Sequence, residues 1–296
     1  MDRSMQEKKT HVPYQKIPSV LGIRRGDFVI IASDITRLAM VSKRKEGSFV
    51  ADKFIDSFQK QVGREGTLMI PSFNFNLRSG DEFSPVTTPP TTGALSLLAF
   101  HRSDFVRTRN PLHSFMVWGR MAGKLASLQN LSSFGKDSPF AIMKDCHAKM
   151  VFIGVKPADA LTFTHYVEED AGVTYRKYKN IRIRYFDEQN LSASKDFLLY
   201  AKRRGWTMRP DRLQQLLKQD LLKTRQINGI YASVLPLDKT YNLIYNDIRE
   251  NNAKNIAAFD PGIFFKDLMK EILYTFKGFR TTGDKIKYGQ NSHTRG

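Results

Sequence analysis

The sequence holds a single cysteine, Cys146, and no stretch that approaches the roughly 20 consecutive apolar residues of a membrane-spanning helix. One cysteine excludes an internal disulfide and any zinc site built from several thiolates. The six histidines show no close grouping with metal-ligand spacing, so we expect no metal site. The polar segment 1–9 lacks the apolar core of a secretory signal, and we therefore expect a cytoplasmic protein.

Acidic residues are scarce relative to basic ones. The chain carries 47 Lys and Arg against 29 Asp and Glu, a formal net charge of +18. This balance suits a polyanionic partner or an anionic membrane surface. The basic residues are dispersed, and no zinc-finger, RNA-binding aromatic or basic-zipper pattern accompanies them, so we expect no specific nucleic-acid binding. A nucleic-acid or membrane-surface binder with a vestigial site stays open as an alternative that rests mainly on charge.

The size and composition are those of a globular protein. With 296 residues, of which 41% are hydrophobic and 26% charged, the chain can bury a sizeable core. We predict one domain over 19–280, within which 186–260 form a partly separate subdomain. Residues 1–18 are expected to be a loose lead-in. The polar, basic segment 281–296 is expected to be a disordered tail because it offers little apolar surface to bury.

Two short apolar runs near the start predict neighbouring strands. Residues 28–34 and 66–73 each run into polar residues, and 48–62 between them carries an apolar stripe with helical spacing. A strand, a helix and a strand in so short a span are typical of a right-handed βαβ unit. We therefore predict an α/β fold, a three-layer sandwich around a central, mostly parallel sheet. Ser33 and Asp34 would lie at a cleft beside the carboxyl end of the first strand.

Further elements have polar residues at their boundaries. Thr92 and Gly93 open a helical segment, where they suit either an ordinary helix cap or contacts to an anionic or amide group. His113 and Ser114 stand where an Asn-Pro turn leads into a strand, which suits either a polar site or strand-edge hydrogen bonds. The remaining predicted elements are strands at 150–155, 175–184 and 230–234 and helices at 162–169, 211–224 and 237–249.

Within the helix predicted at 162–169, His165 and Glu168 stand three residues apart on one face. A carboxylate in that position can hold the imidazole as a general base near neutral pH. The alternative is a solvated surface contact, which is the commoner meaning of this spacing. The pair Cys146-His147 is a weaker candidate, because adjacent side chains point apart in most backbones.

Several segments, taken in order, resemble the aminoglycoside 3-N-acetyltransferase family, whose fold is called antibiotic N-acetyltransferase-like. The resemblance extends over about 20–265. The loop 73–76 with Gly80, together with 165–169, looks most like members found in surface-polysaccharide gene clusters. The segments that carry the resemblance are 66–73, 92–95, 107–119, 135–139 and 162–176.

The resemblance implies acyl transfer from acetyl-CoA to a primary amine of a sugar, by direct attack without an acyl-enzyme. It implies that His165 is the general base and that Glu168 supports it. Family members often have His and Ser where this chain has Ala32 and Asp34, and a His where it has Asn110. Oxyanion donors could be loop amides near Ser114 or the Thr92 hydroxyl. The implied coenzyme-binding positions are Ser33, Asp34, Thr92, Gly93, His113 and Ser114.

The charge balance also bears on the acceptor. Because the chain is strongly basic, we expect an anionic amino sugar, linked to a nucleotide or a lipid, in surface glycan synthesis. A polycationic aminoglycoside drug is the alternative acceptor on the same fold. We leave open whether the chain forms a homo-oligomer and whether its basic surface touches an anionic membrane.

Overall fold

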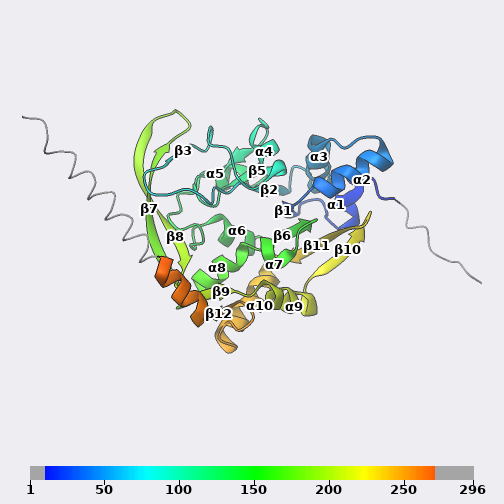
Figure 1. The fold of residues 1–296 in the computed structure, drawn as a ribbon. Coiled ribbons are helices and arrows are strands. Elements are labelled where there is room, and N and C mark those ends of the chain that lie inside the picture. Colours follow the sequence, from blue (N-terminus) through cyan, green and yellow to red (C-terminus); the bar gives the residue numbers. More distant parts are fainter. Residues whose placement is uncertain (1–10, 271–296) are drawn as a thin grey trace, which may run out of the picture.

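The computed structural model describes residues 11–270, so the tail predicted at 281–296 and the start of the predicted lead-in lie outside the described residues. Figure 1 shows helices α1 to α4 gathered on one side of the central strands and α8, α9 and α10 on the other. This arrangement is the three-layer α/β sandwich that the sequence predicts. None of the helices within the described residues is long and apolar enough to cross a membrane.

A seven-stranded sheet in the order β10-β11-β6-β1-β2-β5-β4 forms the centre. Only the pairs β1–β2 and β1–β6 are parallel, and the other pairs of this sheet are antiparallel. The sheet is therefore mixed, with parallel pairing confined to its middle. The strands are β1 (Phe28–Ser33), β2 (Thr67–Pro71), β4 (Val106–Arg107), β5 (Phe115–Gly119), β6 (Lys149–Ile153), β10 (Lys223–Ile227) and β11 (Ile230–Pro236).

Alternate residues of the central strands feed two separate cores. Val29 and Ile31 of β1 belong to one core, and Phe28 and Ile30 belong to the other. Burial on both faces explains why these strands are continuous apolar runs rather than alternating ones. The first core is covered by α1 (Ile17–Val20), α2 (Thr36–Glu46), α3 (Ala51–Val62) and α4 (Ala94–Phe100), and the second by α5 (Ala122–Ala126), α6 (Pro139–Asp145), α8 (Phe163–Asp170), α9 (Pro210–Asp220) and α10 (Leu237–Glu250).

The loose lead-in predicted at 1–18 is shorter than expected. Residues Tyr14–Lys16 form a 3-10 helix that continues into α1, and Tyr14 and Ile17 are buried. The ring of Tyr14 packs against that of Phe49 at a centroid distance of 4.8 Å. Two large side chains thus anchor this segment to the rest of the domain. The polar residues around them make this anchoring difficult to predict from the sequence.

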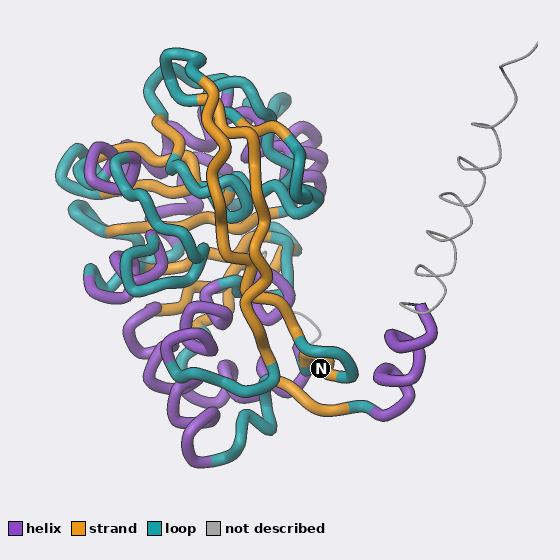
Figure 2. The backbone as a smooth tube through the Cα atoms, turned by 90° about the vertical axis from the view of Figure 1, so that its left-hand side faces the viewer, coloured by secondary structure: helices purple, strands orange, loops and turns teal. Residues whose placement is uncertain are grey.

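A long hairpin lies outside the central sheet. Its strands β7 (Arg176–Phe186) and β8 (Ser192–Lys202) form a second sheet with β3 (Glu82–Phe83), and Figure 2 shows the hairpin running along one side of the molecule. Its tip buries the side chains at 181, 183 and 185, as the predicted alternation requires. At its base the other face is buried, through Arg176 and Tyr200. The hairpin therefore turns opposite faces inward at its two ends.

Residues 186–260 contribute to every sheet. They supply β8 to the hairpin, β10 and β11 to the central sheet, and the small sheet formed by β9 (Trp206–Met208) and β12 (Ala257–Phe259). The helix predicted at 211–224 ends at Asp220, because the chain from Lys223 pairs with β11 as an edge strand. The short helix α7 (Pro157–Ala160) joins β6 to α8.

Gly119 provides a test of how closely β5 approaches β2. Its φ is +99°, and a Cβ there would lie 2.3 Å from the Gly66 carbonyl oxygen. We expect Gly119→Ala to lower the free energy of unfolding by more than about 2 kcal/mol, through backbone strain and the clash. Chemical denaturation measures this change.

Gly123→Ala is the matched control. Nothing lies within 4 Å of a Cβ at Gly123, and the residue sits inside α5. Alanine there should leave stability unchanged or raise it by about 0.5–1 kcal/mol. Equal losses in the two variants would contradict the proposed contact between β5 and β2.

Candidate active site

The helix that carries His165 is placed by a glycine turn. Gly154, directly after β6, has a φ of +71°, and a Cβ there would lie 2.5 Å from the Asp34 carbonyl oxygen. The turn brings α7 and α8 to the carboxyl edge of β1 and β6. Phe163, Tyr166 and Val167 then anchor α8 in the core. His165, with its side chain 28% exposed, remains at the surface of a cavity.

His165 and Glu168 form a close pair inside the protein. The His165 Nδ1 lies 2.7 Å from Glu168 Oε2, and the Glu168 side chain is 0% exposed. The pair is therefore not a solvated surface contact. A buried carboxylate that binds one ring nitrogen fixes the orientation of the imidazole.

Two further residues hold the carboxylate. Tyr175 donates its hydroxyl to Glu168 Oε1 at 2.9 Å. Arg176 Nε lies 2.7 Å from Oε2 but is not aligned for a hydrogen bond, so this contact is an ion pair. Sequence reasoning missed both roles, although the need of a buried carboxylate for a nearby cation could have pointed to Arg176.

These partners decide the charge of Glu168. Burial favours the neutral acid, but the hydrogen bond and charge of His165, the charge of Arg176 and the Tyr175 hydroxyl outweigh it and keep the pKa of Glu168 below its usual value. Glu168 is therefore ionised at neutral pH. Burial, together with the charge of Glu168, also raises the pKa of the Tyr175 phenol, which stays protonated and able to donate.

The ring nitrogen next to this carboxylate has two neighbours. Nδ1 of His165 is 2.7 Å from Glu168 Oε2 and 2.9 Å from Arg176 Nη2. The carboxylate can only accept a hydrogen bond and the guanidinium can only donate one, so the two contacts make opposite demands on Nδ1. The contact with the buried carboxylate is the shorter one, and on that ground we assign a proton to Nδ1. The neutral ring then carries its lone pair on Nε2, the atom that a base needs.

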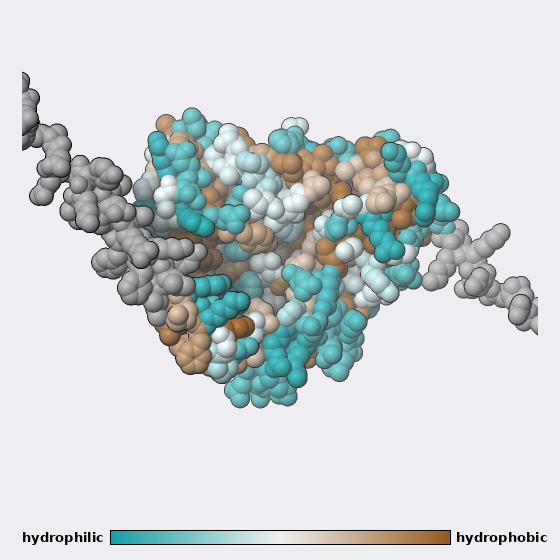
Figure 3. Space-filling model, viewed as in Figure 1, coloured by the Kyte–Doolittle hydropathy of each residue, from teal (hydrophilic) through white to brown (hydrophobic). Residues whose placement is uncertain are grey.

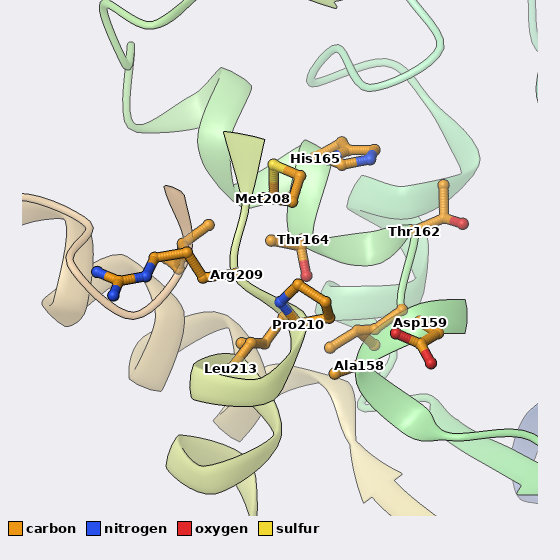
Figure 4. Close-up of a pocket in the computed structure, with 11 residues that line it drawn as sticks. Ala158, Asp159, Thr162, Thr164, His165, Met208, Arg209, Pro210 and Leu213 are labelled. Atoms are coloured by element: carbon orange, nitrogen blue, oxygen red, sulfur yellow. The ribbon is translucent and has the colours of Figure 1, made fainter. Parts of the chain in front are cut away.

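Two cavities near His165 share lining residues. The helix cavity, of about 250 Å³, lies between α7, α8, β9 and α9 and is lined by His165. The strand-edge cavity, of about 220 Å³, lies at the carboxyl ends of β1 and β2 beside α4. Asp159 and Thr162 line both cavities. Figure 3 shows this face hollowed across its middle, with hydrophilic side chains gathered below the hollow, and Figure 4 shows the helix cavity.

The structure brings only some of the implied coenzyme positions to a cavity. Ser33 and Thr92 both line the strand-edge cavity, and Gly93 precedes α4 with a φ of +99°. The Thr92 hydroxyl lies 2.7 Å from the Pro71 carbonyl, to which it donates, so its proton is not free for an oxyanion. The Asp34 carboxylate accepts the Thr36 amide at 2.9 Å and does not line that cavity.

His113 and Ser114 lie deeper. Ser114 is 0% exposed, donates to the Ser72 carbonyl and accepts from Arg107 Nε at 2.9 Å. His113 Nδ1 lies 2.9 Å from the Ser133 hydroxyl, and burial, with the nearby charge of His165, lowers the pKa of His113 to about 3. His113 is therefore neutral. The Phe134 ring lies between the two histidines, with centroids 4.7 Å from His113 and 5.4 Å from His165.

The other candidates play no part in this cluster. Cys146 is exposed, beyond the end of α6, and His147 beside it pairs with Asp238. Among residues 11–270, no group of three His, Cys, Asp or Glu side chains is placed to hold a metal ion. His165 and the residues around Glu168 therefore remain the candidates for the chemistry of the site.

A family model described as aminoglycoside 3-N-acetyltransferase matches residues 31–244. The chain belongs to this family. The match spans the central sheet from β1 to β11 together with the His165 cluster. No curated protein matches the chain.

Solved structures share the fold. AAC-IIIb, in a binary complex with CoASH, is 16% identical, with 80% of this chain and 95% of that chain covered and a TM-score of 0.67. AAC-VIa bound to sisomicin is 16% identical, with 82% and 99% covered and a TM-score of 0.68. The YokD protein from Bacillus subtilis is 18% identical, with 83% and 97% covered and a TM-score of 0.68. At these identities the likeness shows the fold alone.

Family membership confirms the resemblance seen in the sequence and the class of reaction. The protein is an N-acetyltransferase with acetyl-CoA as its acyl donor. The similarity to members from surface-polysaccharide gene clusters, and the particular residues that act, stay predictions.

Glu168→Gln tests the buried ion cluster. The change leaves the Arg176 cation without its carboxylate, and we expect it to lower the free energy of unfolding at pH 7 by about 3–5 kcal/mol. Because the folded-state pKa of Glu168 lies below its ordinary value of 4.5, its contribution is complete above pH 4.5 and is lost as the pH falls through the folded-state pKa. The difference in the free energy of unfolding between wild type and variant should therefore disappear in acid. Denaturation at several pH values measures it.

Glu169→Gln is the neighbouring control. Burial raises the pKa of Glu169, so the fold favours its neutral form. A neutral amide there should leave stability at pH 7 unchanged or raise it. If the difference in unfolding free energy between wild type and Glu168→Gln stayed constant down to strong acid, Glu168 would not be held ionised.

Proposed function

We propose that the protein acetylates a primary amine of an anionic amino sugar, in the cytoplasm and as a step of surface glycan synthesis, with His165 as the general base. The observation that carries the proposal is the position of His165. Its ring is oriented by a buried carboxylate and lies in the wall of one cavity, and two other residues of that wall, Asp159 and Thr162, also line a second cavity. A base between two binding spaces suits a reaction that joins two substrates.

The orientation of the imidazole determines the route by which the proton is transferred. Glu168 holds the proton of Nδ1, so Nε2 can accept the proton that the amine loses as it attacks the thioester. The imidazolium that forms is stabilised by the ionised carboxylate. The same nitrogen can return the proton to the departing thiolate. No side-chain nucleophile is needed.

The strand-edge cavity suits the acyl donor, which supplies an activated thioester when bound. Its walls include Ile31, Ile70 and Phe73, which suit the apolar parts of a pantetheine arm, and the Ser33 hydroxyl, which suits an amide. Nothing lies within 4 Å of the Cβ position of Gly93, so a chain can pass close to the backbone there. We assign Ser33 and Gly93 to donor binding, and Asp34, Thr92, His113 and Ser114 to positioning the loops around the site.

The helix cavity is left for the acceptor. Asp159 and Arg209 are the charged residues in its lining besides the histidine. The base of the hairpin beside it carries exposed cations, among them Lys177 and Arg203, whose Nε donates to the Arg176 carbonyl at 3.2 Å. The lining thus pairs one carboxylate with one guanidinium, and the exposed cations lie on the neighbouring hairpin. This balance favours an acceptor with a single amine and a negative group over a polycation.

An aminoglycoside acceptor is the second candidate. The family description and the relative bound to sisomicin favour it. A multiply protonated drug would, however, meet repulsion that amounts to about 1 kcal/mol for each close pair of like charges in solvent. This alternative differs from the first in the sign of the acceptor charge, which makes the two easy to separate.

His165→Ala should lower turnover on a confirmed acceptor by about 100- to 10,000-fold, because the base is lost. Binding of coenzyme A should survive, with a stabilisation of about 2.7 kcal/mol at 100 times its dissociation constant. Steady-state kinetics and thermal shift measure the two effects.

The control for this variant is His147→Ala. His147 is an exposed histidine, 78% accessible, outside both cavities, and its loss should leave turnover unchanged. Near-normal turnover in His165→Ala would show that another group accepts the proton.

The acceptor is tested by competition. We expect a nucleotide-linked amino sugar to be acetylated faster than an aminoglycoside at low salt, with a smaller advantage at moderate salt, because screening weakens the charge effect. The initial rates of both acceptors in one mixture give the ratio directly. Faster turnover of the aminoglycoside at both ionic strengths would refute the anionic acceptor.

A further inference from the structure

The wall of the helix cavity holds a buried hydroxyl with no partner. Thr164 is 2% exposed, lines the cavity, and its Oγ1 makes no hydrogen bond among the described residues. Figure 4 shows this hydroxyl pointing away from the ring of His165 and toward Pro210. A buried polar group without a partner is costly to a fold, so its presence in a binding cavity points to a ligand.

The Thr164 hydroxyl does not make the bond that is usual for a helical threonine. A threonine hydroxyl inside a helix commonly donates to the carbonyl four residues earlier. For Thr164 that residue is Ala160, whose carbonyl accepts the Thr162 amide at 3.0 Å and no hydrogen bond from the Thr164 hydroxyl. The hydroxyl of Thr164, in the first turn of α8, therefore takes no part in the hydrogen bonds of the helix.

The surroundings of this hydroxyl are aliphatic. The part of the lining contributed by β9, α9 and the segment before β12 consists of Met208, Pro210, Leu213 and Ile256, with Arg209 beside them. Pro210 has no amide hydrogen, and the Arg209 amide already donates to the Ile256 carbonyl at 2.8 Å. Figure 4 shows the Arg209 guanidinium extending away from Pro210. A ligand with several hydroxyls at this end would bury most of them unpaired.

The polar groups gather at the other end. Asp159 and Thr162 line both the helix cavity and the strand-edge cavity, and His165 lines the helix cavity three residues further along the chain from Thr162. The reacting amine belongs at this end, since the base and the acyl donor must both reach it. The aliphatic end, with its single hydroxyl, then receives the far side of the sugar ring.

We infer that the acceptor is a deoxy amino sugar, whose methyl group packs against Met208, Leu213 and Ile256 and whose neighbouring ring hydroxyl bonds to Thr164. A methyl group suits an aliphatic wall, and a single hydroxyl satisfies the single unpaired Oγ1. Thr164 is in this assignment a specificity-determining residue, not a catalytic one. The inference rests on the proposed function and names the substrate class of the same site.

The test compares pairs of nucleotide-linked amino hexoses that differ only in whether C6 is a methyl or a hydroxymethyl group, with the amine at C3 and at C4 in turn. The wild type should prefer the methyl sugar by about 10- to 100-fold in kcat/KM, the range that one buried hydroxyl supports. Thr164→Val should raise the acceptor KM about tenfold. The KM for acetyl-CoA should not change, and Thr164→Ser should recover most of the loss.

Stability separates a ligand contact from a structural role. Because Oγ1 makes no hydrogen bond within residues 11–270, Thr164→Val should not lower the melting temperature. Ser42→Ala removes another buried, unpartnered hydroxyl that lies in α2, outside the cavity, and should leave the acceptor KM unchanged.

The outcomes fall into two groups. Equal rates for the methyl and hydroxymethyl sugars, or a lower melting temperature in Thr164→Val with an unchanged acceptor KM, would overturn the inference while the proposed function stands. Acetylation of an aminoglycoside, with none of any amino hexose, would overturn both. A preference for the methyl sugar that Thr164→Val weakens and Thr164→Ser keeps would establish the assignment.

Discussion

One buried carboxylate organises the candidate active site. Glu168 has no contact with solvent, yet its pKa is held low, because a histidine, an arginine and a tyrosine converge on it. Removing an ionised group from water is so unfavourable that each partner must be held in place by the fold. Two of the three come from the chain that enters the hairpin, which ties the geometry of α8 to that of a separate sheet. The orientation of His165 is thus a property of the whole molecule.

The central sheet makes this arrangement possible. Its middle strands are buried on both faces, so their carboxyl ends offer a rigid edge at which loops and helix starts converge. The turn at Gly154 delivers α7 and α8 to that edge, and the loop after β2 supplies the opposite wall. The buried Arg107 secures this loop by donating to the Ser72 carbonyl and Asn74 Oδ1 at 2.9 and 2.7 Å. Neutral acceptors satisfy this cation, and burial lowers the pKa of Arg107 to about 10.

Local patterns in the sequence predict the elements well and the contacts between distant elements poorly. The strands β1, β2 and β6 and the helix α8 follow from apolar runs and spacing, since these signals lie within a few residues. The overlong helix predicted at 211–224 shows the limit, because leucines also suit the turn into an edge strand. The pairing of His165 with Glu168 could be predicted because both lie on one helix. The roles of Arg176 and Tyr175 could not, because they depend on how the hairpin folds back.

The hairpin also restricts how the length of the chain can vary. Its strands pair one to one from Arg176 opposite Lys202 to Phe186 opposite Ser192. An extra residue within β7 would reverse the direction of every side chain on one side of the insertion and carry Arg176 away from Glu168. The connection at 187–191 bears no such constraint, because it lies at the far end from the site. We therefore expect that insertions accumulate in that connection during evolution, and that a label attached there would leave the chemistry undisturbed.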